Sequence, residues 1–245
     1  MKKTALAFLI VALLLVTGCA TSRVVAPGLA GQYTRSFSRE ITKTISANYV
    51  LYLPDGYGTD DRRWPLVLFL HGSGERGTDL NRVKIHGPLK LVDQGKKFSF
   101  ILVAPQCPDN EEWSAEVLGG LLDDIEQHYA VDTNRVYVTG LSMGGYGTWR
   151  LGMAFPARFA ALAPICGGES SVRVCSLKKV PIRVYHGKKD DVVPVQESEK
   201  LVKKLNACGG NAELIVYPEA GHDSWTETYN DPAFYEWLLG QSLNR

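Results

Sequence analysis

The sequence lacks an excess of charge of either sign and contains no basic block. Its 245 residues hold 27 Lys and Arg against 26 Asp and Glu, which gives a formal net charge of +1. Nucleic acid is therefore not an expected partner, because binding to phosphates requires clustered cations. Histidine and cysteine are also sparse, at five residues each, and no group of them has the spacing of a zinc site. We expect no metal and no other cofactor.

Long apolar runs are scarce too, and the one at the N-terminus is too short to span a bilayer as a mature helix. It extends from Ala5 to Val16 and follows the basic residues Lys2 and Lys3, as in a secretory signal. The run ends in Leu-Val-Thr-Gly-Cys, with small residues directly before Cys19. This segment resembles a bacterial lipoprotein signal, whose cleavage leaves the cysteine as a lipid-carrying N-terminus.

These features divide the chain into three parts. We expect residues 1–18 to be a signal peptide, residues 19–32 a lipidated tether and residues 33–245 one folded domain. Several acyl chains on Cys19 would give stable anchoring, and Ala20 at the next position resembles the signal for sorting to the outer membrane. The expected location is therefore the bacterial cell envelope. The alternative is a plain secretory peptide that contains a cysteine by coincidence.

Four cysteines remain for disulfide formation if Cys19 carries lipid: Cys107, Cys166, Cys175 and Cys208. In an oxidising compartment these four thiols allow three complete pairings. Cys166 and Cys175 lie near each other in the chain and flank a Gly-Gly turn, so this pair is the first candidate.

Short apolar runs alternate with longer amphipathic segments along the rest of the chain. The runs expected to form strands are 48–53, 65–70, 100–104, 135–139, 181–185 and 212–217. The segments expected to form helices are 115–129, 145–155, 195–207 and 231–239. This alternation predicts an α/β fold in which a mostly parallel sheet is covered by helices on both faces. Ligands bind outside the carboxyl ends of the strands in such sheets, so residues at strand ends are the candidates for function.

The segment Gly140–Gly144 has the pattern G-x-S-x-G around Ser142. The expected strand leads directly into it and a helix-compatible segment leaves it, which is the context of a nucleophile elbow. Glycines flank the serine in an elbow because the turn leaves no room for side chains. Ser142 is therefore the predicted nucleophile, placed at the positive N-terminus of a helix.

A serine hydroxyl needs a base to accept its proton, and the chain has five histidines. His222 follows the last expected strand, which matches the chain order Ser, acid, His of one class of serine hydrolases. His71 and His186 each end a buried strand, whereas His86 lies in a loop and His128 within a helical segment. We therefore predict His222 as the base.

The third member of such a triad is a carboxylate that fixes the imidazole tautomer. Two adjacent candidates, Asp190 and Asp191, follow the penultimate expected strand. Asp190 lies four residues before Pro194, an arrangement that resembles the acid loop of many esterases of this class. Asp190 is the predicted acid, and Asp191 is the alternative.

Acyl transfer also requires donors for the developing oxyanion. One predicted donor is the backbone N–H of Met143, directly after the nucleophile. The other is the N–H of Ser73, in a glycine-rich loop after an early buried strand, with Gly72 and Gly74 as alternatives. The chain has no G-x-x-x-x-G-K-[ST] segment, so this loop does not predict nucleotide binding.

Five segments together resemble the α/β-hydrolase superfamily: 71–77, 104–108, 140–149, 186–194 and 221–225. They are most similar to the poly(3-hydroxybutyrate) depolymerase/feruloyl esterase-like and phospholipase/carboxylesterase-like group, some members of which are labelled predicted peptidases. The resemblance implies a triad of Ser142, Asp190 and His222 with Ser73 and Met143 as oxyanion donors. We expect a serine hydrolase that cleaves carboxylic esters through an acyl-enzyme. The alternatives are a serine peptidase and a catalytically silent, surface-anchored binding module.

The segment between Ile165 and Val180, where many relatives insert a lid, is short here. No large lid is expected, and the site should be open to small or polymeric ester substrates. We hypothesise that Trp113 and Trp225 line the acyl or alcohol pocket, with ordinary core or surface packing as the alternative. Glu75 and Arg76 either orient a polar substrate or pair with each other; neither is predicted as catalytic.

Overall fold

The computed structural model describes residues 32, 34 and 36–243. The predicted signal peptide, Cys19 and nearly all of the predicted tether lie outside the described residues. Contacts divide the chain between Thr42 and Lys43, so the folded unit begins at Lys43 rather than at residue 33. The described residues before Lys43 form no helix or strand. Within the described part of the chain, no helix combines the length and the apolar character needed to cross a bilayer.

The folded unit is built on one seven-stranded sheet with the order β1-β3-β2-β4-β5-β6-β7. Only β1 runs antiparallel to its neighbour, and the other six strands are parallel. The predicted mostly parallel sheet is therefore confirmed. The strands are β1 (Tyr49–Tyr52), β2 (Trp64–Leu70), β3 (Ile101–Pro105), β4 (Val131–Leu141), β5 (Ala161–Ile165), β6 (Ile182–Gly187) and β7 (Ala212–Tyr217).

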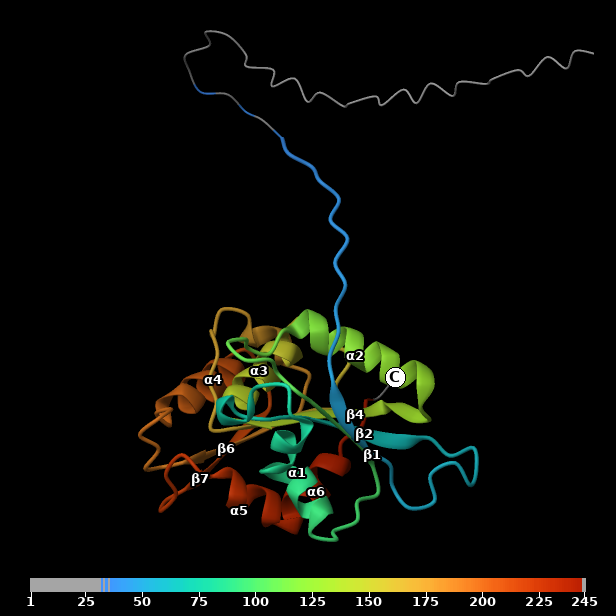
Figure 1. Cartoon of the computed structure of the whole chain (residues 1–245). Coiled ribbons are helices and arrows are strands. Elements are labelled where there is room, and N and C mark those ends of the chain that lie inside the picture. Colours follow the sequence, from blue (N-terminus) through green and yellow to red (C-terminus); the bar gives the residue numbers. More distant parts are fainter. Residues whose placement is uncertain (1–31, 33, 35, 244–245) are drawn as a thin grey trace, which may run out of the picture. The chain divides into compact units, whose positions relative to one another are not determined.

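Helices cover both faces of this sheet, as predicted. Figure 1 shows α2 (Ala115–His128), α3 (Met143–Ala154) and α4 (Gln196–Ala207) above it. The other face is covered by α1 (Gly87–Asp93), α5 (Trp225–Asn230) and α6 (Pro232–Leu239). Asp231 caps the last helix through its side chain, and Pro232 occupies its first turn.

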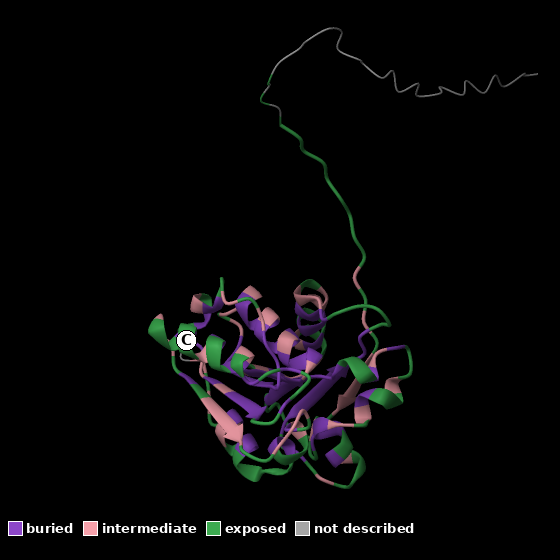
Figure 2. Ribbon diagram, turned by 90° about the vertical axis from the view of Figure 1, so that its left-hand side faces the viewer, coloured by how far each residue is buried: buried purple, intermediate pink, exposed green. Residues whose placement is uncertain are grey.

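The strand β2 shows why its sequence is a continuous apolar run. Leu66, Leu68 and Leu70 belong to the core under α2, α3 and α4, whereas Val67 and Phe69 belong to the core on the opposite face. Alternate residues of a strand point to opposite faces, so a strand covered on both sides must be apolar at every position. Figure 2 shows the sheet as the buried centre of the unit.

Three elements were not among the expected ones: β5, α1 and α5. Strand β5 has the sequence Ala-Leu-Ala-Pro-Ile, which contains one β-branched residue and a proline, a composition that disfavours a strand. Every residue of β5 is nevertheless buried, and the strand pairs with β4 and β6. Its position between two strong strands, rather than its own propensity, makes it extended.

The connection from β5 to β6 contains one short 3-10 helix, η3 (Val174–Leu177), and no lid. The expected pairing of Cys166 with Cys175 is wrong, because the disulfide joins Cys175 to Cys208. Cys175 lies in η3, which packs against α4, and Cys208 is the C-cap of α4. Cys166 instead follows the end of β5 and is buried as a free thiol, like Cys107.

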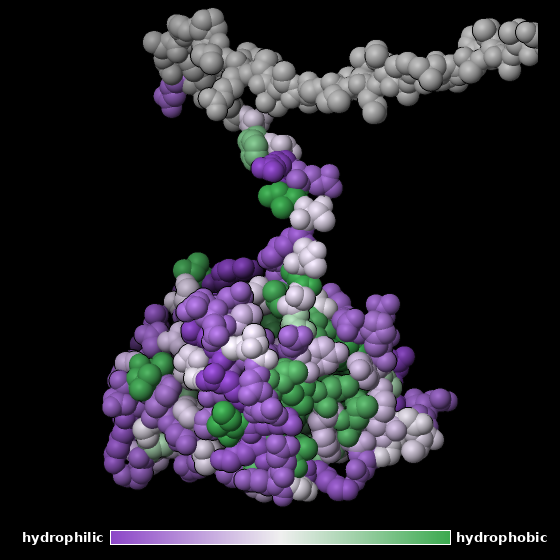
Figure 3. Space-filling view, viewed as in Figure 1, coloured by the Kyte–Doolittle hydropathy of each residue, from purple (hydrophilic) through white to green (hydrophobic). Residues whose placement is uncertain are grey.

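Hydrophilic residues cover most of the face of the folded unit seen in Figure 3, and hydrophobic residues gather near the middle of that face. The large hydrophobic side chains that are exposed within the described residues come from separate segments, as scattered surface hydrophobics do. They are Phe37, Ile41, Leu53, Ile85, Phe155, Val172 and Val192.

Candidate active site

The turn between β4 and α3 holds Ser142 in a sharp elbow. Its backbone has φ 53° and ψ −116°, a left-handed conformation that is uncommon for a residue with a side chain. A Cβ on Gly144 would collide with the backbone carbonyl of Leu70, and one on Gly140 would lie 2.5 Å from the carbonyl oxygen of Gly144. The flanking glycines are thus required by packing against β2. The turn raises the Ser142 side chain at the start of α3.

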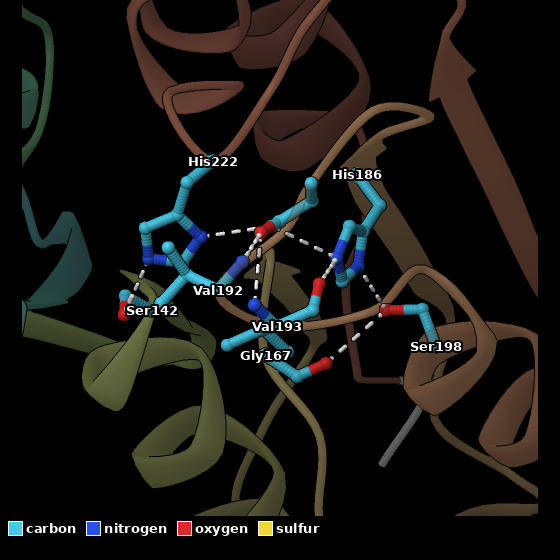
Figure 4. A network of polar contacts seen from close by, with 8 residues as sticks. Ser142, Gly167, His186, Val192, Val193, Ser198 and His222 are labelled. Atoms are coloured by element: carbon cyan, nitrogen blue, oxygen red, sulfur yellow. Dashed lines mark hydrogen bonds and ion pairs between the residues drawn. The ribbon is translucent and has the colours of Figure 1, made fainter.

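The structure brings Ser142, His222 and Asp190 together although they are far apart in the sequence. Nε2 of His222 lies 2.9 Å from Oγ of Ser142, and Nδ1 of His222 lies 2.8 Å from Oδ2 of Asp190 (Figure 4). An ionised carboxylate only accepts hydrogen bonds, so Nδ1 carries the proton. Nε2 is then free to accept the proton of the serine hydroxyl.

Asp190, and not Asp191, makes the contact with His222. Asp190 is buried, and its Oδ1 accepts hydrogen bonds from the N–H groups of Val192 and Val193 at 2.9 and 2.8 Å. Burial disfavours the ionised carboxyl, but the hydrogen bonds from His222 and the two amides outweigh it and lower the pKa of Asp190. Asp190 is therefore held as a carboxylate, while Asp191 is exposed.

The loops that carry the acid and the histidine lie side by side because they follow neighbouring strands, β6 and β7. The N–H of Lys189 donates to the carbonyl oxygen of Ala220 at 2.9 Å. A Cβ on Gly187 would collide with the carbonyl oxygen of Gly221. This close backbone approach fixes the position of His222 relative to Asp190.

The two predicted oxyanion donors lie at the first positions of two helices. Ser73 begins the 3-10 helix η1 (Ser73–Glu75) and Met143 begins α3, and first-turn N–H groups have no partner within their own helix. Both residues line the same cleft as Ser142. The loop around Ser73 is held by buried Glu75, whose carboxylate accepts the N–H of Gly72 at 2.9 Å. Ser73 and Met143 therefore stand at helix starts beside Ser142, and their role as oxyanion donors stays a prediction.

The side chain of His71 contacts the backbone of this loop and is unsuited to be the base. Its side chain is buried, with Nδ1 2.6 Å from the carbonyl oxygen of Gly72 and Nε2 accepting the N–H of Cys107 at 3.0 Å. Burial lowers the pKa of its imidazole to about 4. Nε2 of His86 lies 3.7 Å from Oε1 of Glu75. Exposed His128 ends α2, with its Nδ1 3.1 Å from Oδ1 of Asp124. Neither histidine contacts Ser142.

Ser142 opens onto a cleft of about 680 Å³. Trp113 contributes to its wall, but its ring is mostly buried and packs 4.7 Å from the ring of His71, to whose carbonyl its indole N–H donates. Trp225 is not among the residues lining this cleft. Its ring instead stands edge-on to His222 at 5.3 Å. The residues lining the cleft are Ser73, Arg76, Glu112, Trp113, Ser142, Met143, Tyr146, Arg150, Glu169, Ser170, Glu197 and Lys200.

Most of the charged residues in this wall were not predicted from the sequence. Tyr146 and Arg150 follow Ser142 at intervals of four residues, so the helical period of α3 places them on the side of the nucleophile. Both residues could have been identified in the sequence from that spacing. Arg150 pairs with Glu112 and Glu169, each at 3.0 Å, and these acids come from irregular segments that carry no such period.

Cys166 lies next to the triad. Its Sγ, one carboxylate oxygen of Asp190 and one ring nitrogen of His222 all lie within 4.8 Å of one another. Such a trio has donors suited to a soft divalent metal. Burial raises the pKa of the Cys166 thiol to about 12, so the side chain stands beside the triad as a neutral thiol. The 2.8 Å contact between His222 and Asp190 fits a shared proton rather than a metal between them.

Fold and geometry together define an α/β hydrolase, which confirms the resemblance seen in the sequence. The model of the dienelactone hydrolase family matches residues 103–235, more than half of the chain. The chain therefore belongs to the dienelactone hydrolase family.

Its relatives include several esterases. The chain is 28% identical over 150 residues to the bifunctional acetylxylan esterase/xylanase XynS20E of Neocallimastix patriciarum, covering 57% of this chain and 21% of that protein. It is 28% identical over 193 residues to the poly(3-hydroxyoctanoate) depolymerase of Pseudomonas fluorescens, covering 65% and 68%. A solved structure of a thermostable esterase is 38% identical with a TM-score of 0.70, covering 80% of this chain and 59% of that one. The chain thus spans a fifth of the bifunctional enzyme and less than two thirds of the thermostable esterase.

Proposed function

We propose that this protein is a serine hydrolase that cleaves carboxylic esters through an acyl-enzyme on Ser142. The observation that carries the proposal is the pair of hydrogen bonds that links Ser142 Oγ to His222 and His222 to Asp190, at 2.9 and 2.8 Å. Three groups aligned in this way form a charge-stabilised base beside a nucleophile. The esterases among the relatives support the choice of an ester as the bond that is cleaved.

In the proposed acylation step, Ser142 Oγ attacks the ester carbonyl carbon and gives its proton to Nε2 of His222. The carbonyl oxygen becomes an oxyanion and accepts hydrogen bonds from the backbone N–H groups of Met143 and Ser73. The carbon–oxygen bond to the alcohol then breaks, and the His222 imidazolium returns the proton to the departing alcohol oxygen. Asp190 stays ionised throughout, in keeping with its lowered pKa.

Deacylation repeats these steps with water in place of the serine. His222 takes a proton from the attacking water, and the same two amides hold the second oxyanion. The bond between Ser142 Oγ and the acyl carbon breaks, and Oγ recovers its proton from His222. The product is a carboxylic acid, and the enzyme returns to its starting state.

The cleft favours an ester with a polar, hydroxylated alcohol, such as an acylated sugar, over an apolar polyester. Half of its lining residues are charged: Arg76, Glu112, Arg150, Glu169, Glu197 and Lys200. An apolar chain lying over these charged groups would remove the water that solvates them and cost free energy, whereas sugar hydroxyls can both donate and accept hydrogen bonds. A relative that carries an acetylxylan esterase agrees with this preference.

The direct test compares hydrolysis of a short-chain chromogenic ester by the full chain and by its Ser142→Ala variant. The proposal requires that the variant lose roughly three or more orders of magnitude in kcat. Comparable rates would remove Ser142 from the mechanism. Ser142-dependent cleavage of peptide amides without ester hydrolysis would identify a peptidase, and absence of both, with no labelling of Ser142 by an organophosphate, would identify a binding module.

We also propose that the chain is held at the cell envelope by acyl chains on Cys19. The basic start, the short apolar run and the small residues before this cysteine support the proposal. Metabolic labelling with a fatty acid, followed by fractionation of membranes, tests it. Label and membrane association should both be lost in the Cys19→Ser variant; retention of both would contradict the anchor.

A further inference from the structure

Asp190 contacts a second imidazole, that of His186, which has no part in the proposed mechanism. His186 lies near the end of β6, and its side chain is 0% exposed. Its Nε2 lies 3.2 Å from Oδ2 of Asp190, the same oxygen that lies 2.8 Å from Nδ1 of His222. Two histidines therefore share one carboxylate oxygen, one at the cleft and one in the interior (Figure 4).

The surroundings of His186 fix which of its nitrogens carries the proton. Nε2 faces two acceptors, Oδ2 of Asp190 and the carbonyl oxygen of Val193 at 2.8 Å. A bare nitrogen there would face oxygen lone pairs, so Nε2 must be protonated. The shorter contact is to Val193, so the N–H of His186 donates to that carbonyl oxygen, and the same polar hydrogen faces the carboxylate at the longer distance.

The other nitrogen of His186 is satisfied by Ser198 in the first turn of α4. Ser198 is fully buried, and its Oγ lies 2.8 Å from Nδ1 of His186 and 3.2 Å from the carbonyl oxygen of Gly167. The Ser198 hydroxyl donates to the carbonyl oxygen of Gly167, and the hydroxyl oxygen lies at hydrogen-bond distance from Nδ1 of the imidazole. Gly167 in turn packs against the backbone of Gly145 in α3. A continuous set of contacts therefore links the acid to the helix that carries the nucleophile.

We propose that His186 is a positioning residue that fixes the Asp190 carboxylate for His222, and that Ser198 holds the ring of His186 in the required orientation. This inference rests on the proposed function, because it assigns a role in the same reaction.

The geometry explains why a second histidine is useful. The amides of Val192 and Val193 both hold Oδ1 of Asp190, so the position of the carboxylate depends on the loop that carries them. The N–H of His186 holds the carbonyl oxygen of Val193 in that loop at 2.8 Å, and its Nε2 also lies 3.2 Å from Oδ2. Because the orientation of His222 depends on Oδ2, loss of this donor would misalign the base, and a misplacement of about 1 Å can lower a rate roughly 100-fold.

Two substitutions that differ in reach test this role. In His186→Gln, the longer amide can place an N–H near the position of Nε2 and keep the donor to Asp190. In His186→Asn, the amide reaches only the position of Nδ1, and the donor is lost. We expect His186→Gln to keep kcat within about fivefold of the wild type and His186→Asn to lose roughly 100-fold in kcat with KM little changed. His128→Gln, at an exposed histidine of α2, is the control that should change neither constant.

Ser198→Ala provides a second measurement if the His186 variants fail to fold. It removes only the hydroxyl that orients the imidazole, so kcat should fall several-fold, while the loss of two buried hydrogen bonds should lower the melting temperature by only a few degrees. Equal activity of folded His186→Asn and wild type, equal losses in His186→Gln and His186→Asn, or an unchanged kcat in Ser198→Ala when the His186 variants do not fold would each overturn the inference.

A readout without substrate separates this inference from the proposed function. The proton shared by Nδ1 of His222 and Asp190 can be followed by proton NMR in the free protein. Its resonance should be preserved in His186→Gln and shifted or broadened in His186→Asn. An unshifted resonance in His186→Asn would refute the positioning role, whereas a wild type without ester hydrolysis would refute the proposed function alone.

Discussion

Oγ of Ser142 and Nε2 of His222 lie 2.9 Å apart although 80 residues separate them in the chain. The contact exists because the elbow after β4 and the loop after β7 both emerge at the carboxyl edge of one parallel sheet. The carboxyl ends of parallel strands lie along one edge of the sheet, which is why α/β sheets place their sites there. The consequences of this arrangement can be tested one residue at a time.

Adjacent carboxylates offer a matched pair of substitutions. Asp190→Asn should lower kcat by roughly three to four orders of magnitude, because the neutral amide no longer fixes the tautomer or stabilises the imidazolium of His222. Asp191→Asn should change kcat less than about twofold, since Asp191 is exposed. Kinetics with one chromogenic ester measures both. Loss of activity in Asp191→Asn alone would show that Asp191, and not Asp190, is the acid of the triad.

The elbow predicts a strong steric effect at Gly144. A Cβ there would collide with the backbone carbonyl of Leu70 in β2, and a backbone carbonyl in the centre of a sheet has little freedom to move. Gly144→Ala should therefore destabilise the fold by about 3 kcal/mol or more. Gly74→Ala is the control, because a Cβ at Gly74 meets nothing within 4 Å. Denaturant unfolding of the two variants should separate them clearly; similar midpoints would show that the elbow is less tightly packed.

Stability should depend on pH through His71. Burial lowers the pKa of this imidazole from 6.5 to about 4 in the folded state, so the unfolded chain binds a proton that the folded protein does not. Stability is therefore complete above about pH 6.5 and falls as the pH decreases to about 4, by up to about 3 kcal/mol. Asp190, whose pKa is also lowered, adds a loss only below its ordinary range, near pH 4.

The His71→Gln variant isolates this contribution. Its free energy of unfolding should decline less steeply than that of the wild type between pH 6.5 and pH 4, whatever its stability at neutral pH. Urea unfolding at a series of pH values measures both slopes. Parallel curves for the two proteins would mean that His71 titrates normally in the folded state.

The disulfide between Cys175 and Cys208 joins η3 to the end of α4 across 33 residues. Closing a loop of that length stabilises the fold by about 4 kcal/mol in the chain-entropy model. Cys175→Ser and Cys208→Ser should each lower the melting temperature, and the double variant should be no less stable than either single one. Additive losses in the double variant would indicate two independent thiols instead of one bond.

The triad could be predicted from the sequence because each member follows a strand whose apolar run is clear in the sequence. Ser142 follows a buried strand and is framed by glycines, and Asp190 and His222 follow the last two strands. The carboxyl ends of parallel strands lie at one edge of the sheet, so residues that directly follow these strands are expected at the same edge. Asp190 was preferred to Asp191 because it lies four residues before Pro194, and in the structure its Oδ2 lies 2.8 Å from Nδ1 of His222.

The rest of the cleft could not be predicted in this way. Glu112 and Glu169 reach Arg150 from irregular segments, whose positions depend on tertiary packing rather than on a period in the sequence. Strand β5 was missed because burial between two neighbours overrides its weak propensity. The same omission led to the wrong disulfide, since the end of β5 carries Cys166 into the site and away from Cys175.

The most direct test of the central claim is a mass measurement on the enzyme during turnover. Rapid quenching of the full chain with an ester that deacylates slowly should give a protein whose mass is increased by one acyl group, and peptide mapping should place that group on Ser142. The proposed mechanism predicts that Ser142→Ala acquires no adduct and releases no alcohol. Release of alcohol at the wild-type rate without any adduct on Ser142 would contradict it.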